Sequence, residues 1–190
     1  MVDRERRKKL AFHLRHLAVG LISNDEFEDY VTDDVTFGWL PEQYYRSKEA
    51  KFDDPIIRPM LELSWCLYSD LKEHKLTGND RLTDEALKDI ARYILFLHSD
   101  FEYEWPYLDP TNPLIRFSFK DLLLSILTLG KHYRHKITER EQQFDEFKNT
   151  GNYDLWPFID KDQYEQQLKN QPFFAGQKSE RNRRLAQWRG

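Results

Sequence analysis

The sequence predicts an all-α protein, a compact helical bundle of about five to eight helices with a basic C-terminal tail. Apolar residues recur at helical spacing in several segments, and residues that cap helix N-termini precede many of them. Strand-like patterns are confined to residues 115–119 and 35–40. We expect one helical domain over residues 1–176 and a flexible or peripheral basic tail over residues 177–190.

Capping residues mark the expected helix starts. Three pairs have capping-box spacing, in which a side chain accepts from one unpaired amide and a residue three positions on accepts from another. These pairs are Ser23 with Glu26, Thr138 with Glu141 and, more loosely, Asp160 with Gln163. Asp54 before Pro55, and Thr83 before two acids, indicate two further starts.

Three segments have the apolar pattern of core helices. One is expected from Pro55 to about Leu76, with an end at Gly78. A second, from Asp84 to His98, has an apolar stripe wide enough to predict that it is largely buried. A third, from about Ser118 to His132, is almost entirely apolar over 122–129 and is expected at the centre of the domain, with its leucines buried.

Charge is distributed unevenly along the chain. The net charge is −4, although residues 1–20 and residues 177–190 each carry +4, which leaves −12 on the body between them. Two short basic ends do not form the basic face that grips a phosphate backbone, so nucleic acid is not the expected partner. An acidic body favours a basic protein partner.

The cysteine content and the length of the apolar runs indicate where in the cell we expect the protein. Cys66 is the one cysteine, which favours a reducing compartment and a cytoplasmic location. Because it lies inside an apolar helical segment, we expect it to be an inert small hydrophobe. The apolar stretch from Leu122 to Leu129 is far shorter than the ~20 residues that span a bilayer, so no membrane span is expected.

Acidic and aromatic residues alternate from Asp100 to Trp105, and related residues follow. In an extended segment, this alternation places the acids on one side and the rings on the other. We identify the segment as the candidate binding surface for a basic partner. Its residues are Asp100, Glu102, Tyr103, Glu104, Trp105, Tyr107 and Asp109.

Paired carboxylates among aromatic residues also suit glycosidic cleavage, in which one acts as acid and the other as base or nucleophile. Carboxylates two positions apart do not establish the facing geometry that this reaction requires. The sequence therefore favours binding over catalysis. A helical hydrolase that draws Glu, Asp and His from separate helices is the alternative.

Two histidine pairs have a spacing that would give a metal ion two ligands each, His13 with His16 and His132 with His135. Neither pair has the adjacent acid of a His-Glu-x-x-His motif, and cations surround both. We therefore expect no metal site and no cofactor.

One short motif occurs twice, 51 residues apart. Residues 105–109 and 156–160 share the order Trp, Pro, aromatic, aliphatic, Asp. The flanking residues do not align, so the motif predicts either two connectors or two aromatic docking sites, and no repeat architecture. Together these patterns predict a small acidic helical protein that binds another protein, such as an inhibitor or immunity-type partner of a basic protein.

Overall fold

A computed structural model describes residues 1–39, 43–44, 47–48, 53–106 and 124–169. These residues form helices and turns without a strand, which confirms the all-α class. The helices are α1 (Arg4–Ala18), α2 (Asn24–Asp34), α4 (Ile57–Trp65), α5 (Asp84–Leu97), α7 (Lys131–Lys148) and α8 (Lys161–Lys169), with short 3-10 helices η2 (Gly78–Asp80) and η3 (Tyr153–Leu155). The predicted tail and residues 115–119 lie outside the described residues.

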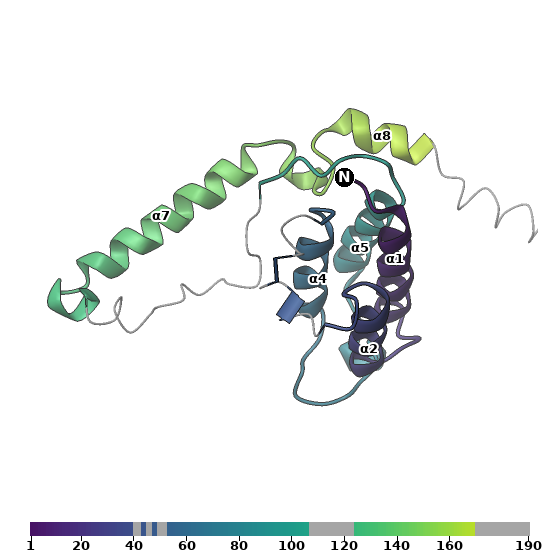
Figure 1. The fold of residues 1–190 in the computed structure, drawn as a ribbon. Coiled ribbons are helices and arrows are strands. Elements are labelled where there is room, and N and C mark those ends of the chain that lie inside the picture. The colour runs from purple at the N-terminus through teal and green to yellow at the C-terminus, as the bar shows by residue number, and fades with distance from the viewer. Residues whose placement is uncertain (40–42, 45–46, 49–52, 107–123, 170–190) are drawn as a thin grey trace, which may run out of the picture.

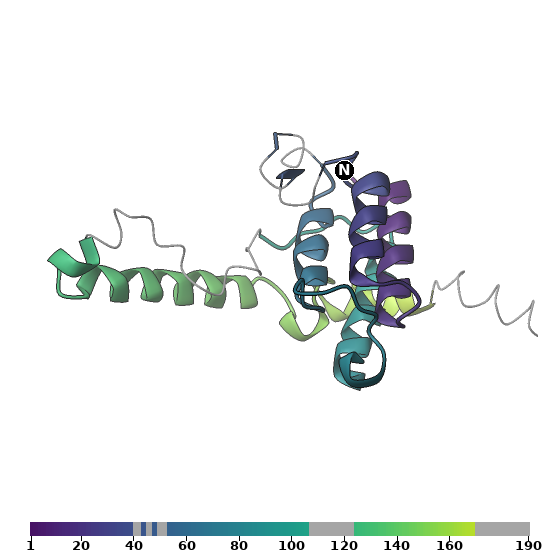
Figure 2. The ribbon, with the colours of Figure 1, turned by 90° about the horizontal axis from the view of Figure 1, so that it is seen from below.

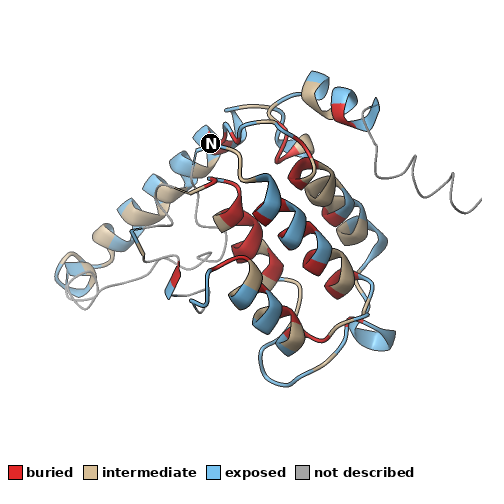
Figure 3. Ribbon diagram, turned by 45° about the vertical axis from the view of Figure 1, so that its right-hand side comes forward, coloured by how far each residue is buried: buried red, intermediate tan, exposed pale blue. Residues whose placement is uncertain are grey.

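Helix α1 is the centre of the bundle and packs against α2, α4 and α5 (Figures 1 and 2). Leu10, Leu14 and Leu17 recur on one face of α1 and are fully buried. Burial of each leucine contributes about 1.5–3 kcal/mol. The buried residues of the bundle lie on the sides of the helices that face one another, while the exposed residues face solvent (Figure 3).

Several predicted helix starts are confirmed. Ser23 accepts from the amide of Glu26, and the Glu26 carboxylate accepts from the amide of Ser23 at 2.8 Å, which completes the capping box of α2. Thr83 caps α5, and Asp160 accepts a hydrogen bond from the first turn of α8. These caps satisfy amides that the helices leave unpaired.

The capping box predicted at Thr138 is wrong. Thr138 lies inside α7, and its hydroxyl donates to the carbonyl of Arg134, four residues earlier. Such a bond satisfies the hydroxyl of a threonine in a helix interior, so capping-box spacing alone does not identify a helix start. The chain turns into α7 at Gly130, whose φ of +83° suits glycine.

The helix predicted from Pro55 to about Leu76 is shorter, because α4 begins at Ile57 and ends at Trp65. The predicted cap at Asp54 is wrong as well, since Ile56 is the N-cap residue and the Asp54 carboxylate binds Arg7.

The side chain of Asn24, the first residue of α2, binds the chain beyond the end of α4. It donates to the carbonyl of Lys72 at 3.2 Å and accepts from the amide of His74 at 2.7 Å. The carbonyl of Lys72 and the amide of His74 therefore bond to the side chain of Asn24 and not to backbone groups of a longer α4.

Helix α5 forms where predicted but is less buried than expected. Ile90, Phe96 and Leu97 are buried, whereas Leu87 and Tyr93 are partly buried. Among the described helices, α5 packs mainly against α1 and also contacts α8, so part of its wide apolar stripe stays accessible. The predicted helix end at Gly78 is instead the start of η2.

The segment predicted at the centre of the domain is exposed in its described part. Residues 124–127 are helical, residues 128–130 form a turn, and Leu127 is 71% exposed. They lie at the far end of α7, which stands away from the bundle as an arm (Figures 1 and 2). Residues 118–123, including Leu123, are outside the described residues. None of the helices described is long and apolar enough to cross a bilayer.

Candidate functional site

The described part of the predicted binding surface has the expected alternation. Its exposed acids are Asp100, Glu102 and Glu104. Tyr103 and Trp105 are buried, so the rings expected to anchor a partner belong to the core. Tyr107 and Asp109 lie outside the described residues.

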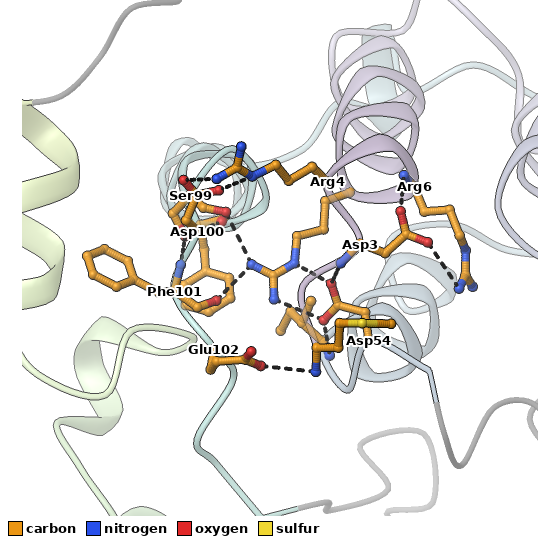
Figure 4. A network of polar contacts seen from close by, with 12 residues as sticks. Asp3, Arg4, Arg6, Asp54, Ser99, Asp100, Phe101 and Glu102 are labelled. Carbon is orange, nitrogen blue, oxygen red and sulfur yellow. Dashed lines mark hydrogen bonds and ion pairs between the residues drawn. The ribbon is translucent and has the colours of Figure 1, made fainter.

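Each of the three acids contacts another part of the chain. Arg4 binds Asp100 through two contacts of 2.5 and 2.6 Å, and Glu102 lies 3.3 Å from the amino group of Met1 (Figure 4). Glu104 accepts from the side chain of Gln163 at 3.0 Å. Because these groups are exposed, each contact contributes at most about 1 kcal/mol. Asp100 and Glu102 thus contact the start of the chain and of α1, while Glu104 contacts α8.

Arg7 forms a buried ion pair with Asp54, which Figure 4 shows close to these acids. Two bonds of 2.6 and 2.9 Å join the guanidinium to the carboxylate, and both side chains are fully buried. Arg7 also donates to the carbonyl of Phe101 at 2.8 Å, and Asp54 accepts from the amide of Asp3. The pair therefore fastens the start of α1 to the chain before α4 and to the segment after α5.

The two Trp-Pro segments pack against each other. The indole nitrogen of Trp156 donates to the hydroxyl of Tyr103 at 3.1 Å, and that of Trp105 donates to the carbonyl of Phe158 at 3.3 Å. The Trp105 bond joins the two motifs, and the Trp156 bond joins the second motif to Tyr103, two residues before the first motif. Residues 103–106 therefore pack with the second motif as one unit, while residues 107–109 of the first motif lie outside the described residues.

A pocket of about 490 Å³ lies beside this unit, and residues of α4, α5 and the C-terminal half of α7 line it. Six of its lining residues are aromatic. The lining consists of Pro59, Leu63, Asp89, Arg92, Tyr93, Tyr103, Phe144, Phe147, Tyr153, Asp154 and Trp156. Predominantly apolar walls with a few charged groups are typical of ligand pockets.

Two acids and one arginine set the charge of the pocket. Arg92 is bound on both sides: it donates to Asp89 at 2.7 Å and to the carbonyl of Trp156 at 2.7 Å. The arginine thereby holds α5 against the second Trp-Pro segment. Asp154, on η3, is exposed and supplies a negative charge at the pocket wall.

Tyr93 and Tyr103, two tyrosines of the pocket lining, stay neutral near pH 7. Burial, with the nearby Asp89 carboxylate, raises the pKa of Tyr93 to about 12. Burial also raises the pKa of Tyr103. Both phenols therefore present uncharged rings, and Tyr93 packs edge-to-face on Trp156 with a centroid distance of 5.1 Å.

A cation of the chain itself already lies over two rings of the pocket lining, Phe144 and Tyr153. The ammonium nitrogen of Lys148 is 4.5 Å from the centroid of Phe144 and 5.6 Å from that of Tyr153. Both distances are within the ~6 Å of a cation–π contact. The two rings pack edge-to-face with centroids 6.0 Å apart, so their faces form part of a cage. This arrangement suits an ammonium or guanidinium group.

The histidine pairs lie away from the pocket lining. His13 contacts Asp34 at 2.7 Å and stacks on Tyr30, while His135 contacts Glu139 at 3.3 Å. No group of three metal-ligating side chains occurs in the described parts of the chain.

Cys66 differs from its prediction, because it caps the exposed end of α4 instead of lying inside a helix. Its thiol donates to the carbonyl of Glu62 at 3.6 Å. Partial burial, with the Glu62 charge, raises the pKa of the thiol, so the reactive thiolate is disfavoured.

The chain matches no protein-family model, and neither a curated protein nor a solved structure matches it. The proposed function is therefore based on the chemistry of the pocket.

Sequence patterns did not reveal this pocket, because its residues come from five separate regions of the chain. The available signals were the aromatic content of 15% and the spacing of Asp89 and Arg92, which places both on one helix face.

Proposed function

We propose that this protein binds another protein and that its aromatic pocket receives a lysine or arginine side chain of a basic partner. The position of Lys148 carries the proposal, since an ammonium group of the chain itself already lies over Phe144 and Tyr153. A cation–π contact contributes about 0.5–1 kcal/mol at an exposed site and ~2 kcal/mol or more when desolvated.

The charge of the chain supports a basic partner. The body between the two basic ends carries −12, which attracts a positively charged protein and speeds the encounter at low salt. Inhibition of a basic protein is one role that fits such an interaction. The single cysteine is consistent with action in the reducing cytoplasm.

The alternative function, a helical hydrolase, has less support. Arg92 holds Asp89, and the partners described for His13 and His135 lie outside the pocket lining. Phenols that keep their protons near neutral pH suit a neutral wall better than general-base chemistry.

Blocked pentapeptides of sequence Gly-Gly-X-Gly-Gly test the proposal, with lysine, arginine or norleucine at X. Norleucine has an unbranched alkyl side chain without the positive charge. We expect the lysine and arginine peptides to shift the indole N–H NMR signal of Trp156 with about millimolar affinity. The norleucine peptide should leave the signal unchanged.

Matched ring variants locate the binding. Tyr153 and Tyr30 have nearly equal exposure, 42% and 43%, but Tyr30 is not a pocket residue. Tyr153→Leu should weaken binding of the lysine peptide about two- to fivefold, while Tyr30→Leu should leave it unchanged. Equal binding of the norleucine peptide, or unchanged binding to Tyr153→Leu, would show that the pocket is not a cation site.

A further inference from the structure

The far end of the α7 arm exposes several large apolar side chains. Ile126, Leu127 and Leu129 are 67, 71 and 89% exposed, and Leu124 is 44% exposed. We call residues 124–136 the arm tip. Exposed apolar clusters of this kind mark interaction sites in folded proteins.

The arm tip is also basic. Lys131, Arg134 and Lys136 lie within it, and no Asp or Glu occurs between residues 124 and 136. Lys131 and Arg134 are exposed. A surface that combines leucine side chains with these charges fits an acidic surface that also presents apolar groups.

The outer side of α2 has that complementary composition, and we call it, together with the adjoining ring of Phe12 on α1, the acidic face. Helix α2 contains six acids and neither Lys nor Arg. Among these, Asp25, Asp29 and Asp33 are exposed. The six acids are Asp25, Glu26, Glu28, Asp29, Asp33 and Asp34.

Two exposed rings adjoin these acids, since Phe12 is 59% and Tyr30 43% exposed. The buried ring of His13 lies between them, with centroid distances of 5.4 Å to Phe12 and 5.3 Å to Tyr30. The acidic face therefore offers apolar contact area for the leucines of an arm tip.

The arm tip of one molecule does not meet its own acidic face. In both ribbon views α2 lies on the far side of the bundle from the tip of α7 (Figures 1 and 2). Helix α7 has 18 residues, which at 1.5 Å per residue span about 27 Å, so the tip reaches well beyond the bundle. A second molecule has the matching surface.

We propose that the protein forms a dimer in which the arm tip of each copy binds the acidic face of the other. The exchange is reciprocal, so two identical contacts close the assembly. It buries the exposed leucines and pairs the basic tip with the acidic face. This inference does not depend on the function of the pocket.

Charge reversal tests the dimer in the full chain. One variant carries Lys131→Glu and Arg134→Glu on the arm tip, and the other carries Asp29→Lys and Asp33→Lys on the acidic face. All four residues are exposed, so we expect both variants to fold, and circular dichroism checks this. Each variant alone should dimerise at least about tenfold more weakly than the native chain.

An equimolar mixture of the two variants provides the decisive test. In the mixed pair, an acidic tip meets a basic face and a basic tip meets an acidic face, so both contacts become complementary. A control with Lys161→Glu and Lys169→Glu changes the same charge on α8 and should leave the dimer intact.

Sedimentation velocity from about 1 to about 100 µM measures the association. We expect the native chain and the mixture to dimerise within this range, and each reversed variant alone to dimerise at least about tenfold more weakly. A native chain that stays monomeric throughout this range would overturn the proposal. Reversed variants that dimerise as tightly as the native chain, or a mixture that associates no better than its separate components, would overturn it as well.

Discussion

The indole nitrogen of Trp156 donates to the hydroxyl of Tyr103 across 3.1 Å, and this bond joins two segments that lie 53 residues apart. Together with the bond from Trp105 to Phe158, it packs residues 103–106 against the second Trp-Pro segment as one unit. Trp156 and Tyr103 also line the pocket, so the unit both stabilises the bundle and shapes the candidate binding site.

Replacement of Trp105 by alanine should destabilise the fold by about 3–5 kcal/mol. Its ring is 4% exposed and packs on Phe147 with a centroid distance of 4.9 Å, so truncation leaves a cavity at the root of α7. Urea denaturation measures the loss, and Trp105→Phe should cost less because a ring remains. A stable Trp105→Ala protein with faster dissociation of a partner would instead support a surface role for the ring.

Two carboxylates that bind arginines of α1 should differ strongly in their contribution to stability. Asp54→Ala leaves Arg7 as an uncompensated buried charge and should cost about 3–5 kcal/mol. Asp100→Ala breaks the exposed pair with Arg4 and should cost at most about 1 kcal/mol. Comparable losses in urea denaturation would show that burial of the Arg7 pair is not what stabilises this region.

Removal of the Lys148 charge should strengthen binding of a cationic peptide. In Lys148→Gln the faces of Phe144 and Tyr153 lose their internal cation, so the lysine pentapeptide should bind about two- to fivefold more tightly. Lys169→Gln makes the same charge change on α8 and serves as the control. Equal gains in both variants would indicate a general charge effect instead of competition for the rings.

Replacement of Glu28 by glutamine should stabilise the protein near neutral pH. Burial and the neighbouring acids, led by Asp70 and Asp25, raise the pKa of Glu28, so its ionised form is disfavoured in the folded state. The hydroxyl of Tyr68 donates to Glu28 at 3.0 Å, and a glutamine oxygen accepts the same bond.

The pH dependence of this effect has a definite sign. Because the folded pKa is raised, ionised Glu28 lowers stability above that pKa, and the penalty disappears as the pH falls below the unfolded value of about 4.3. Glu28→Gln should therefore be more stable than the native chain by a few tenths of a kcal/mol near neutral pH and so melt at a higher temperature, whereas the two proteins should melt at the same temperature near pH 4. A constant difference in melting temperature across this range would contradict the explanation.

Local signals in the sequence identified the starts of α2, α5 and α8 but not those of α4 and α7. The capping box of Ser23 and Glu26 and the cap at Thr83 depend on neighbouring residues, so their spacing is enough to identify them. The alternation from Asp100 to Trp105 likewise separated exposed acids from buried rings. That pattern did not show that Arg4 binds Asp100, because the two residues are distant in sequence.

The position of each helix in the bundle was harder to predict. The apolar content of 122–129 suggested a central helix, whereas the central helix is α1, which is rich in Arg and Lys. Arg7 is buried there because Asp54, far along the chain, neutralises it. The pocket was missed for a similar reason, since Tyr93, Phe144 and Trp156, which are distant in sequence, come together only after folding.

Intermolecular nuclear Overhauser effects with the lysine pentapeptide test the central claim most directly. If the pocket receives a cationic side chain, the ε-methylene protons of the peptide lysine should give cross-peaks to the ring protons of Phe144 and Tyr153. Lys148→Gln should strengthen these cross-peaks. Cross-peaks confined to other surfaces, such as the acidic face, would contradict the account.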